Sequence, residues 1–164
     1  MQNYKEVRDQ IRSGDLIAFT HRSWKTWHDI KVQIVRFFTQ SEYSHVAIAW
    51  VTSGRVFLLE AVMPLTRIYP LSLSGDFYWI EMDSPWKPET EEYAMEHIGY
   101  EYSQVEAIEA MFEDIHHDQV NECAAYAIQV AGKDGINLGT KAVPSNVVQT
   151  ALELGKHLHF IKNS

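Results

Sequence analysis

Cys123, His45 and Glu60 are the residues of this chain whose types and spacing could support nucleophilic catalysis. Cys123 is the only cysteine, which excludes an internal disulfide and a metal site built from several cysteines. A cysteine thiolate can attack a carbonyl carbon when a histidine accepts its proton and a carboxylate orients that histidine. A cysteine among alanines is, by itself, more often an inert core residue. The positions of His45 and Glu60 must therefore decide between the two interpretations.

The sequence around Ser53-Gly54 predicts a hairpin that would bring His45 and Glu60 together. Two apolar runs lie on either side of this turn, and a two-residue loop fixes which positions face each other. His45 and Glu60 would then be diagonal neighbours on one face, with Cα atoms roughly 5.5–8 Å apart. A three-residue loop would instead place Glu60 on the opposite face. The register of this hairpin is therefore the test of a His–Glu pair.

Cys123 falls near the start of a predicted helix, for which Asn121 is a suitable N-cap. The first turn of a helix favours a thiolate through the helix dipole and the unpaired backbone amides. Ala47 and Ala49 share the predicted face of His45 and would let another element approach closely. We expect the alanine-rich cysteine helix to pack on that face.

The remaining pattern predicts strands before helices, which indicates an α+β fold in one domain, residues 1–164. Strands are expected at 16–20, 44–51, 55–61, 77–82 and 158–161. Helices are expected at about 1–10, 29–39, 88–99, 103–114, 121–131 and 144–155.

The bulk composition limits the partners of the chain. Its net charge of −8 argues against nucleic acid or an anionic membrane surface as the main partner. No apolar run approaches the ~20 residues needed to span a bilayer, and the N-terminus lacks the apolar segment of a secretion signal. A single unpaired cysteine also fits a reducing compartment. We therefore expect a cytoplasmic protein without a transmembrane segment.

Several short motifs occur in an order that resembles a known family. They are Gly14-Asp15-Leu16-Ile17, Ser44-His45-Val46-Ala47-Ile48, Leu59-Glu60-Ala61, Gly99-Tyr100-Glu101-Tyr102-Ser103, the cysteine helix and Pro144-Ser145-Asn146. This order resembles the circularly permuted papain-like hydrolases, relatives of the NlpC-type cell-wall peptidases in which histidine precedes cysteine. The YiiX-like proteins are the closest type, and lecithin retinol acyltransferase is a more distant relation. The resemblance spans about residues 13–150.

The resemblance implies a permuted papain-like fold, a small curved antiparallel sheet with the cysteine helix packed against it. It also implies roles: Cys123 matches the nucleophile, His45 the general base and Glu60 the residue that orients the base. Family members often carry Ser-Glu directly after the cysteine, where this chain has Ala124-Ala125.

These observations predict a cysteine hydrolase, either a peptidase or amidase or a lipid esterase or acyltransferase, with an acyl-thioester intermediate. The substrate would be a cell-wall peptide or a lipid acyl group, and no cofactor is expected. Trp24, Trp27 and Tyr102 are candidates for lining the substrate groove.

Two alternatives stay open. The first is a non-catalytic lipid- or peptide-binding module on the same fold, in which Cys123 serves only for packing. The second is a zinc site formed by His45, Glu60 and Cys123; because no fourth ligand presents itself, we predict no metal.

Overall fold

The computed structural model describes residues 2–20, 43–101 and 122–163. The strands are β1 (Gln2–Asn3), β2 (Leu16–Thr20), β3 (Tyr43–Thr52), β4 (Arg55–Val62), β5 (Leu65–Pro70), β6 (Phe77–Glu81) and β7 (His157–Lys162). The helices are α1 (Tyr4–Val7), the 3₁₀ turn η1 (Leu71–Leu73), α3 (Pro88–Glu96), α5 (Glu122–Lys133) and α6 (Pro144–Glu153). The expected α+β class is confirmed.

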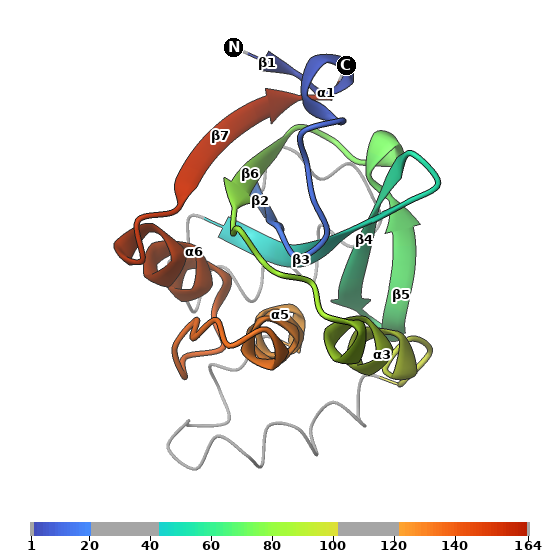
Figure 1. Ribbon diagram of the computed structural model, residues 1–164, viewed down its shortest axis with the longest axis vertical. Coiled ribbons are helices and arrows are strands. Elements are labelled where there is room, and N and C mark those ends of the chain that lie inside the picture. The colour runs from blue at the N-terminus through green and yellow to red at the C-terminus, as the bar shows by residue number, and fades with distance from the viewer. Residues whose placement is uncertain (1, 21–42, 102–121, 164) are drawn as a thin grey trace.

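In the described part of the chain, seven strands form one sheet in the order β1-β7-β6-β2-β3-β4-β5. Figure 1 shows that this sheet is strongly curved, with α1 and both chain ends at its upper rim. Every pair of neighbouring strands is antiparallel except β1 and β7, which run parallel. The sheet is therefore mixed, which corrects the expectation of a purely antiparallel one. The parallel pair joins the first described residues to the last strand.

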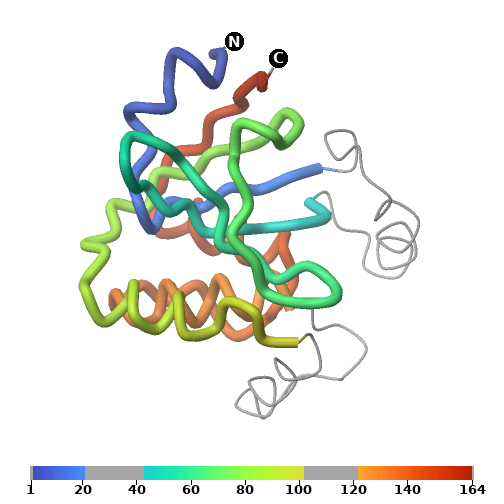
Figure 2. The backbone as a smooth tube through the Cα atoms, turned by 90° about the vertical axis from the view of Figure 1, so that its right-hand side faces the viewer, coloured from blue at the N-terminus to red at the C-terminus, as the bar shows by residue number. Residues whose placement is uncertain are grey.

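The two faces of the sheet carry separate apolar clusters because side chains alternate along each strand. On β3, Val46 and Ile48 belong to the cluster that contains the residues of α5 and α6. Ala47 and Ala49 belong to the second cluster, which lies inside the curve of the sheet together with residues of α1. Helices α3 and α5 run side by side below the sheet (Figure 2).

The β3–β4 turn has the predicted two-residue loop. Ser53 and Gly54 both have positive φ, 51° and 69°, as a two-residue hairpin of type I′ requires. The observed register runs from Ile48 opposite Leu59 to Thr52 opposite Arg55. The predicted hairpin register is therefore confirmed.

Strand β5 was not expected from the sequence, and α1 is shorter than the helix expected over residues 1–10. Only one residue of β5, Thr66, is buried, so this edge strand lacks the apolar alternation that predicts strands. The helices expected at 29–39 and 103–114 lie outside the described residues.

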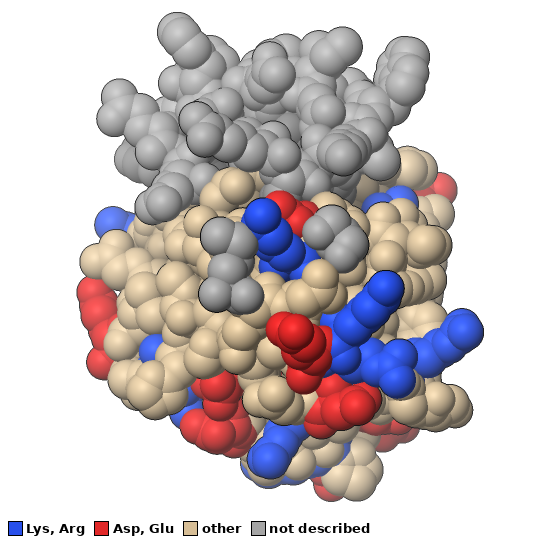
Figure 3. All heavy atoms as spheres, turned by 90° about the horizontal axis from the view of Figure 1, so that it is seen from above, with Lys and Arg blue, Asp and Glu red and all other residues tan. Residues whose placement is uncertain are grey.

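Charge on the surface is mixed rather than segregated on the face that Figure 3 shows, where basic side chains lie beside acidic ones. Within residues 2–20, 43–101 and 122–163, no helix is both long enough and apolar enough to cross a membrane.

Candidate active site

His45 and Glu60 form a buried pair at the centre of the candidate site. His45 is 5% exposed and Glu60 is 1% exposed. The Nε2 atom of His45 lies 2.7 Å from Oε2 of Glu60, a short distance typical of a charge-assisted hydrogen bond. The contact follows from the hairpin register, which places both residues at the same end of β3 and β4. The predicted His–Glu pair is therefore present in the structure.

Arg67 of β5 is a second partner of Glu60 that we did not predict from the sequence. Its Nε and Nη2 atoms both lie 2.8 Å from Oε1 of Glu60. The two residues face each other directly across the β4–β5 pair. The guanidinium also lies over the ring of Tyr69, 4.7 Å from the ring centroid. Both carboxylate oxygens of Glu60 are thus occupied, one by His45 and one by Arg67.

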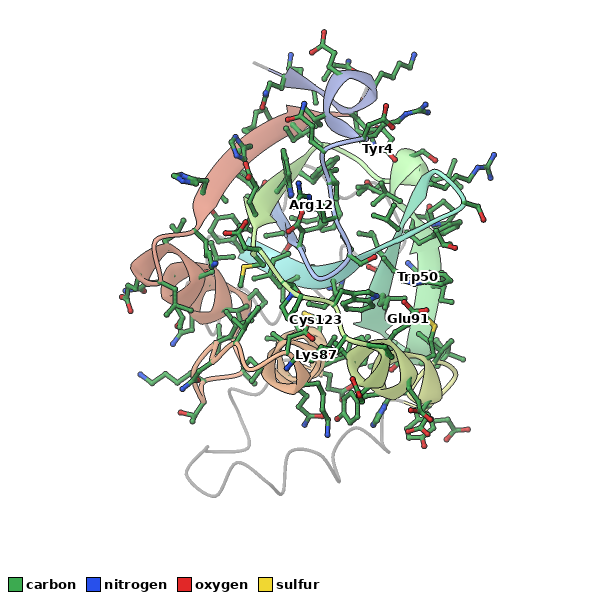
Figure 4. All side chains as sticks on the ribbon, in the orientation of Figure 1. Tyr4, Arg12, Trp50, Lys87, Glu91 and Cys123 are labelled. Carbon is green, nitrogen blue, oxygen red and sulfur yellow. The ribbon has the colours of Figure 1, made fainter. Side chains whose placement is uncertain are left out.

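Cys123 lies in the first turn of α5, on the side of the helix that faces the sheet (Figure 4). Its side chain is buried, with 2% exposure. A side-chain hydrogen bond links Cys123 to His45. Because Nε2 of His45 contacts Glu60, we assign the thiol contact to the other ring nitrogen, Nδ1. The imidazole therefore joins the cysteine to the carboxylate.

The electrostatics of the pair follow from its burial and its partners. Burial alone would lower the pKa of His45, but the charge and hydrogen bond of Cys123, together with those of Glu60, raise that pKa from 6.5 to about 9. Burial alone would raise the pKa of Glu60, but the hydrogen bonds and charges of His45 and Arg67 hold it below its ordinary value. An ionised carboxylate beside an imidazolium is therefore the favoured state of the pair at neutral pH.

The face on which the cysteine helix packs differs from the expectation. Cys123 and the alanines of α5 pack with Val46 and Ile48, whereas Ala47 and Ala49 lie in the other cluster. The prediction that α5 packs on the face of β3 that carries Ala47 and Ala49 is therefore wrong.

A bulge lies in β3 directly before His45. Phe19 of β2 faces His45, but the next residue, Thr20, faces Tyr43, so Ser44 has no opposite partner. A bulge of this kind bends a strand and re-aims its side chains. The irregularity ends at His45, because the pairing from His45 to Ile48 is regular.

The Pro144-Ser145-Asn146 motif supports the site from a distance in the sequence. Ser145, in the first turn of α6, accepts a hydrogen bond from the backbone amide of Tyr43 at 3.3 Å. This bond ties α6 to the start of β3, two residues before His45. The motif therefore helps to position the start of β3, which carries His45.

Four residues singled out in the sequence lie outside the described residues. They are the three candidates for a substrate groove, Trp24, Trp27 and Tyr102, and the expected N-cap Asn121.

The ligand set of the candidate site is poorly suited to a metal ion. Both oxygens of Glu60 are engaged by cationic side chains, His45 and Arg67, which compete with a metal for the same lone pairs. In the part of the chain that the structure describes, no group of three or more His, Cys, Asp or Glu side chains is placed to hold a metal ion.

Comparison with known proteins identifies a fold relation only. The structure is similar to the crystal structure of the metalloprotein YiiX from Escherichia coli O157:H7 (DUF1105), with a TM-score of 0.52 and 20% sequence identity. The similarity covers 79% of this chain and 70% of the YiiX chain. No protein-family model matches the sequence. No curated protein matches it either. The chain therefore has a YiiX-like fold.

Proposed function

We propose that this protein is a cysteine hydrolase or acyltransferase of the permuted papain-like group, in which Cys123, His45 and Glu60 act together. The observation that carries the proposal is the buried contact of His45 Nε2 with Glu60 at 2.7 Å, while the same imidazole is hydrogen-bonded to Cys123 in the first turn of α5. A nucleophile, a base and a residue that orients the base are the three parts that covalent catalysis by cysteine needs.

In the proposed reaction, the thiol proton of Cys123 resides on Nδ1 of His45 in the resting ion pair, and the thiolate attacks an amide or ester carbonyl carbon. Backbone amides at the start of α5 would stabilise the oxyanion of the tetrahedral intermediate. When this intermediate collapses, His45 returns the proton to the departing amine or alcohol, which leaves an acyl-thioester on Cys123. Water or an acceptor alcohol or amine then attacks the thioester, gives a proton to His45 and releases the acyl group, which restores the Cys123 thiolate beside the His45 imidazolium.

The substrate classes that we propose are a cell-wall peptide amide and a lipid ester or amide. The non-catalytic alternative assigns lipid or peptide binding to the same fold and packing to Cys123. The Glu60 environment favours catalysis, because a buried carboxylate with two cationic partners is costly to assemble for packing alone.

YiiX is described as a metalloprotein. A metal function for this chain is not proposed, since Glu60 is already saturated by His45 and Arg67. Metal analysis of the purified protein, with and without prior chelation, tests this separately from the cysteine chemistry.

The proposal is tested by the rate of iodoacetamide alkylation as a function of pH. Cys123 is the only cysteine, so the label reports on one atom. We expect the folded protein to react through a thiolate below pH 7. An ordinary thiol with a pKa near 8.5 is only about 1% thiolate at pH 6.5, so the His45→Ala variant should react up to about 100-fold more slowly at that pH.

The test relies on the shape of the pH profile and not on the absolute rate. Cys123 is 2% exposed, so its alkylation rate also depends on how easily the reagent reaches the thiol. The urea-unfolded protein supplies the profile of the same cysteine without its neighbours, and His157→Ala removes an exposed histidine as a matched control. The proposal would be contradicted if the pH profile of the folded protein coincided with that of the unfolded protein and did not change in His45→Ala. A screen of peptide, ester and lipid substrates, with Cys123→Ser as the blank, then distinguishes the substrate classes.

A further inference from the structure

Glu60 has an unusual position for a buried carboxylate, because it lies between two cationic groups. His45 occupies Oε2, and Arg67 approaches Oε1 with two nitrogen atoms at 2.8 Å. From the thiol outward, the order of groups is therefore cysteine, histidine, glutamate and arginine. If the first pair is ionised, the signs of charge alternate along the whole row, which is the arrangement that lowers the cost of burying them.

The geometry points to Arg67 as a positioning residue of the Cys123 site, which keeps Glu60 ionised and turned toward His45. This inference rests on the function proposed above. Arg67 acts on the site through its contact with Glu60.

The sheet fixes Arg67 in this place. Glu60 and Arg67 are directly opposite each other in the β4–β5 pair, and opposite charges at such positions attract across the strands. Tyr69, two residues further along the same face of β5, supports the guanidinium with its ring. The side chain of Arg67 is 39% exposed, whereas that of Glu60 is 2% exposed. Arg67 thus joins a carboxylate excluded from water to the surface of the protein.

The charge of Arg67 decides where the proton of the His–Glu pair resides. Without a cation at Oε1, burial favours transfer of the imidazolium proton to Glu60, which gives two neutral groups. A neutral imidazole no longer stabilises a thiolate. With Arg67 present, the carboxylate stays charged and the proton stays on His45. Among the described residues, Cys123 of α5 and Glu60 of β4 raise the pKa of His45. Phe19 of β2 contributes a neutral ring whose centroid lies 6.0 Å from that of the His45 ring.

The test compares Arg67→Gln with Arg67→Lys in the iodoacetamide pH series. Glutamine keeps a hydrogen-bond donor for Glu60 but loses the charge, and lysine keeps the charge. We expect Arg67→Gln to shift the acid limb of the profile upward by about one pH unit, so that alkylation on this limb is about tenfold slower. Arg67→Lys should restore most of the wild-type profile. Arg55→Gln, at the exposed start of β4, is the matched control and should change nothing.

A double-variant comparison tests whether Arg67 acts through Glu60. In the Glu60→Gln background there is no carboxylate to hold, so adding Arg67→Gln should leave the profile unchanged. The double variant Glu60→Gln/Arg67→Gln leaves no buried carboxylate unpaired. If Arg67→Gln alone does not fold, the double variant is therefore compared with Glu60→Gln instead. The inference is overturned if Arg67→Gln coincides with the wild type, or if it shifts the profile equally in both backgrounds. Failure of the proposed function gives a different result, since His45→Ala would then have no effect.

Discussion

Two buried carboxylates, Asp15 directly before β2 and Glu60 in β4, have opposite surroundings. Asp15 accepts hydrogen bonds from the backbone amides of Arg12 and Met82, both at 2.9 Å, and from the indole of Trp79 at 2.8 Å. None of these donors carries a charge. Glu60 instead receives its hydrogen bonds from an imidazole and a guanidinium.

The surroundings move the two pKa values in opposite directions. Burial raises the pKa of Asp15, and its neutral hydrogen bonds only partly oppose that rise. Burial also acts to raise the pKa of Glu60, but two cationic partners reverse the effect. The Asp15 network fastens the start of β2 to β6, whereas the Glu60 network contains groups that can exchange protons. The difference shows why the Gly14-Asp15 motif is structural and the Ser44-His45 motif is the candidate for chemistry.

The comparison is tested most strongly by the pH dependence of stability. Because the folded pKa of His45 is raised from 6.5 to about 9, its protonation stabilises the fold fully below pH 6.5 and this contribution is lost as the pH rises to about 9. At about 1.4 kcal/mol per pKa unit, the contribution has an upper bound of about 3 to 4 kcal/mol. The stability difference between wild type and His45→Gln should therefore shrink across this window in urea unfolding.

Asp15 supplies the control for that measurement. None of its three donors titrates between pH 6.5 and 9, so the destabilisation caused by Asp15→Asn should be the same at both ends of the window. A constant difference for His45→Gln, parallel to that of Asp15→Asn, would remove the distinction between the two networks.

The next effect in size is the cost of Asp15→Asn itself. Met82 donates to one oxygen of Asp15, and Arg12 and Trp79 donate to the other. The amide nitrogen of asparagine replaces one of these two acceptors, and a buried donor left unpaired costs about 1–3 kcal/mol. We expect a lower urea midpoint with no change in the alkylation profile of Cys123. Asp9→Asn, on an exposed side chain, is the control for loss of an acidic group. A shifted alkylation profile in Asp15→Asn would show that the networks are coupled.

The sequence was sufficient to predict the hairpin and the His45–Glu60 pair because turn chemistry fixes register locally. Ser53 and Gly54 adopt the positive φ values of a two-residue loop, and the side-chain alternation then determines which residues share a face. The position of Cys123 in the first turn of α5 was also predictable, because the local sequence pattern shows where this helix begins.

Two features depended on information that periodicity does not contain. The packing face of α5 was predicted incorrectly because small residues such as Ala47 and Ala49 fit either side of a curved sheet. Arg67 was missed because β5 has little apolar alternation. A signal for it does exist, since continuing the β4–β5 hairpin through Met63-Pro64 places Arg67 directly opposite Glu60.

The smallest predicted effect concerns Tyr69, which tests how far the titratable network extends beyond Glu60. The guanidinium of Arg67 lies 4.7 Å from the ring centroid of Tyr69, and such a contact at a partly exposed site contributes about 0.5–1 kcal/mol.

Replacing Tyr69 with leucine keeps an apolar side chain on β5 but removes the π face, so Arg67 should hold Glu60 less firmly. We expect the acid limb of the alkylation profile to move upward by a few tenths of a pH unit, less than for Arg67→Gln and in the same direction. Tyr69→Phe keeps the ring without the hydroxyl, which contacts the backbone oxygen of Leu73, and should leave the profile unchanged. An equal shift in Tyr69→Phe and Tyr69→Leu would assign the effect to that hydroxyl, and the network that sets the reactivity of Cys123 would then end at Arg67.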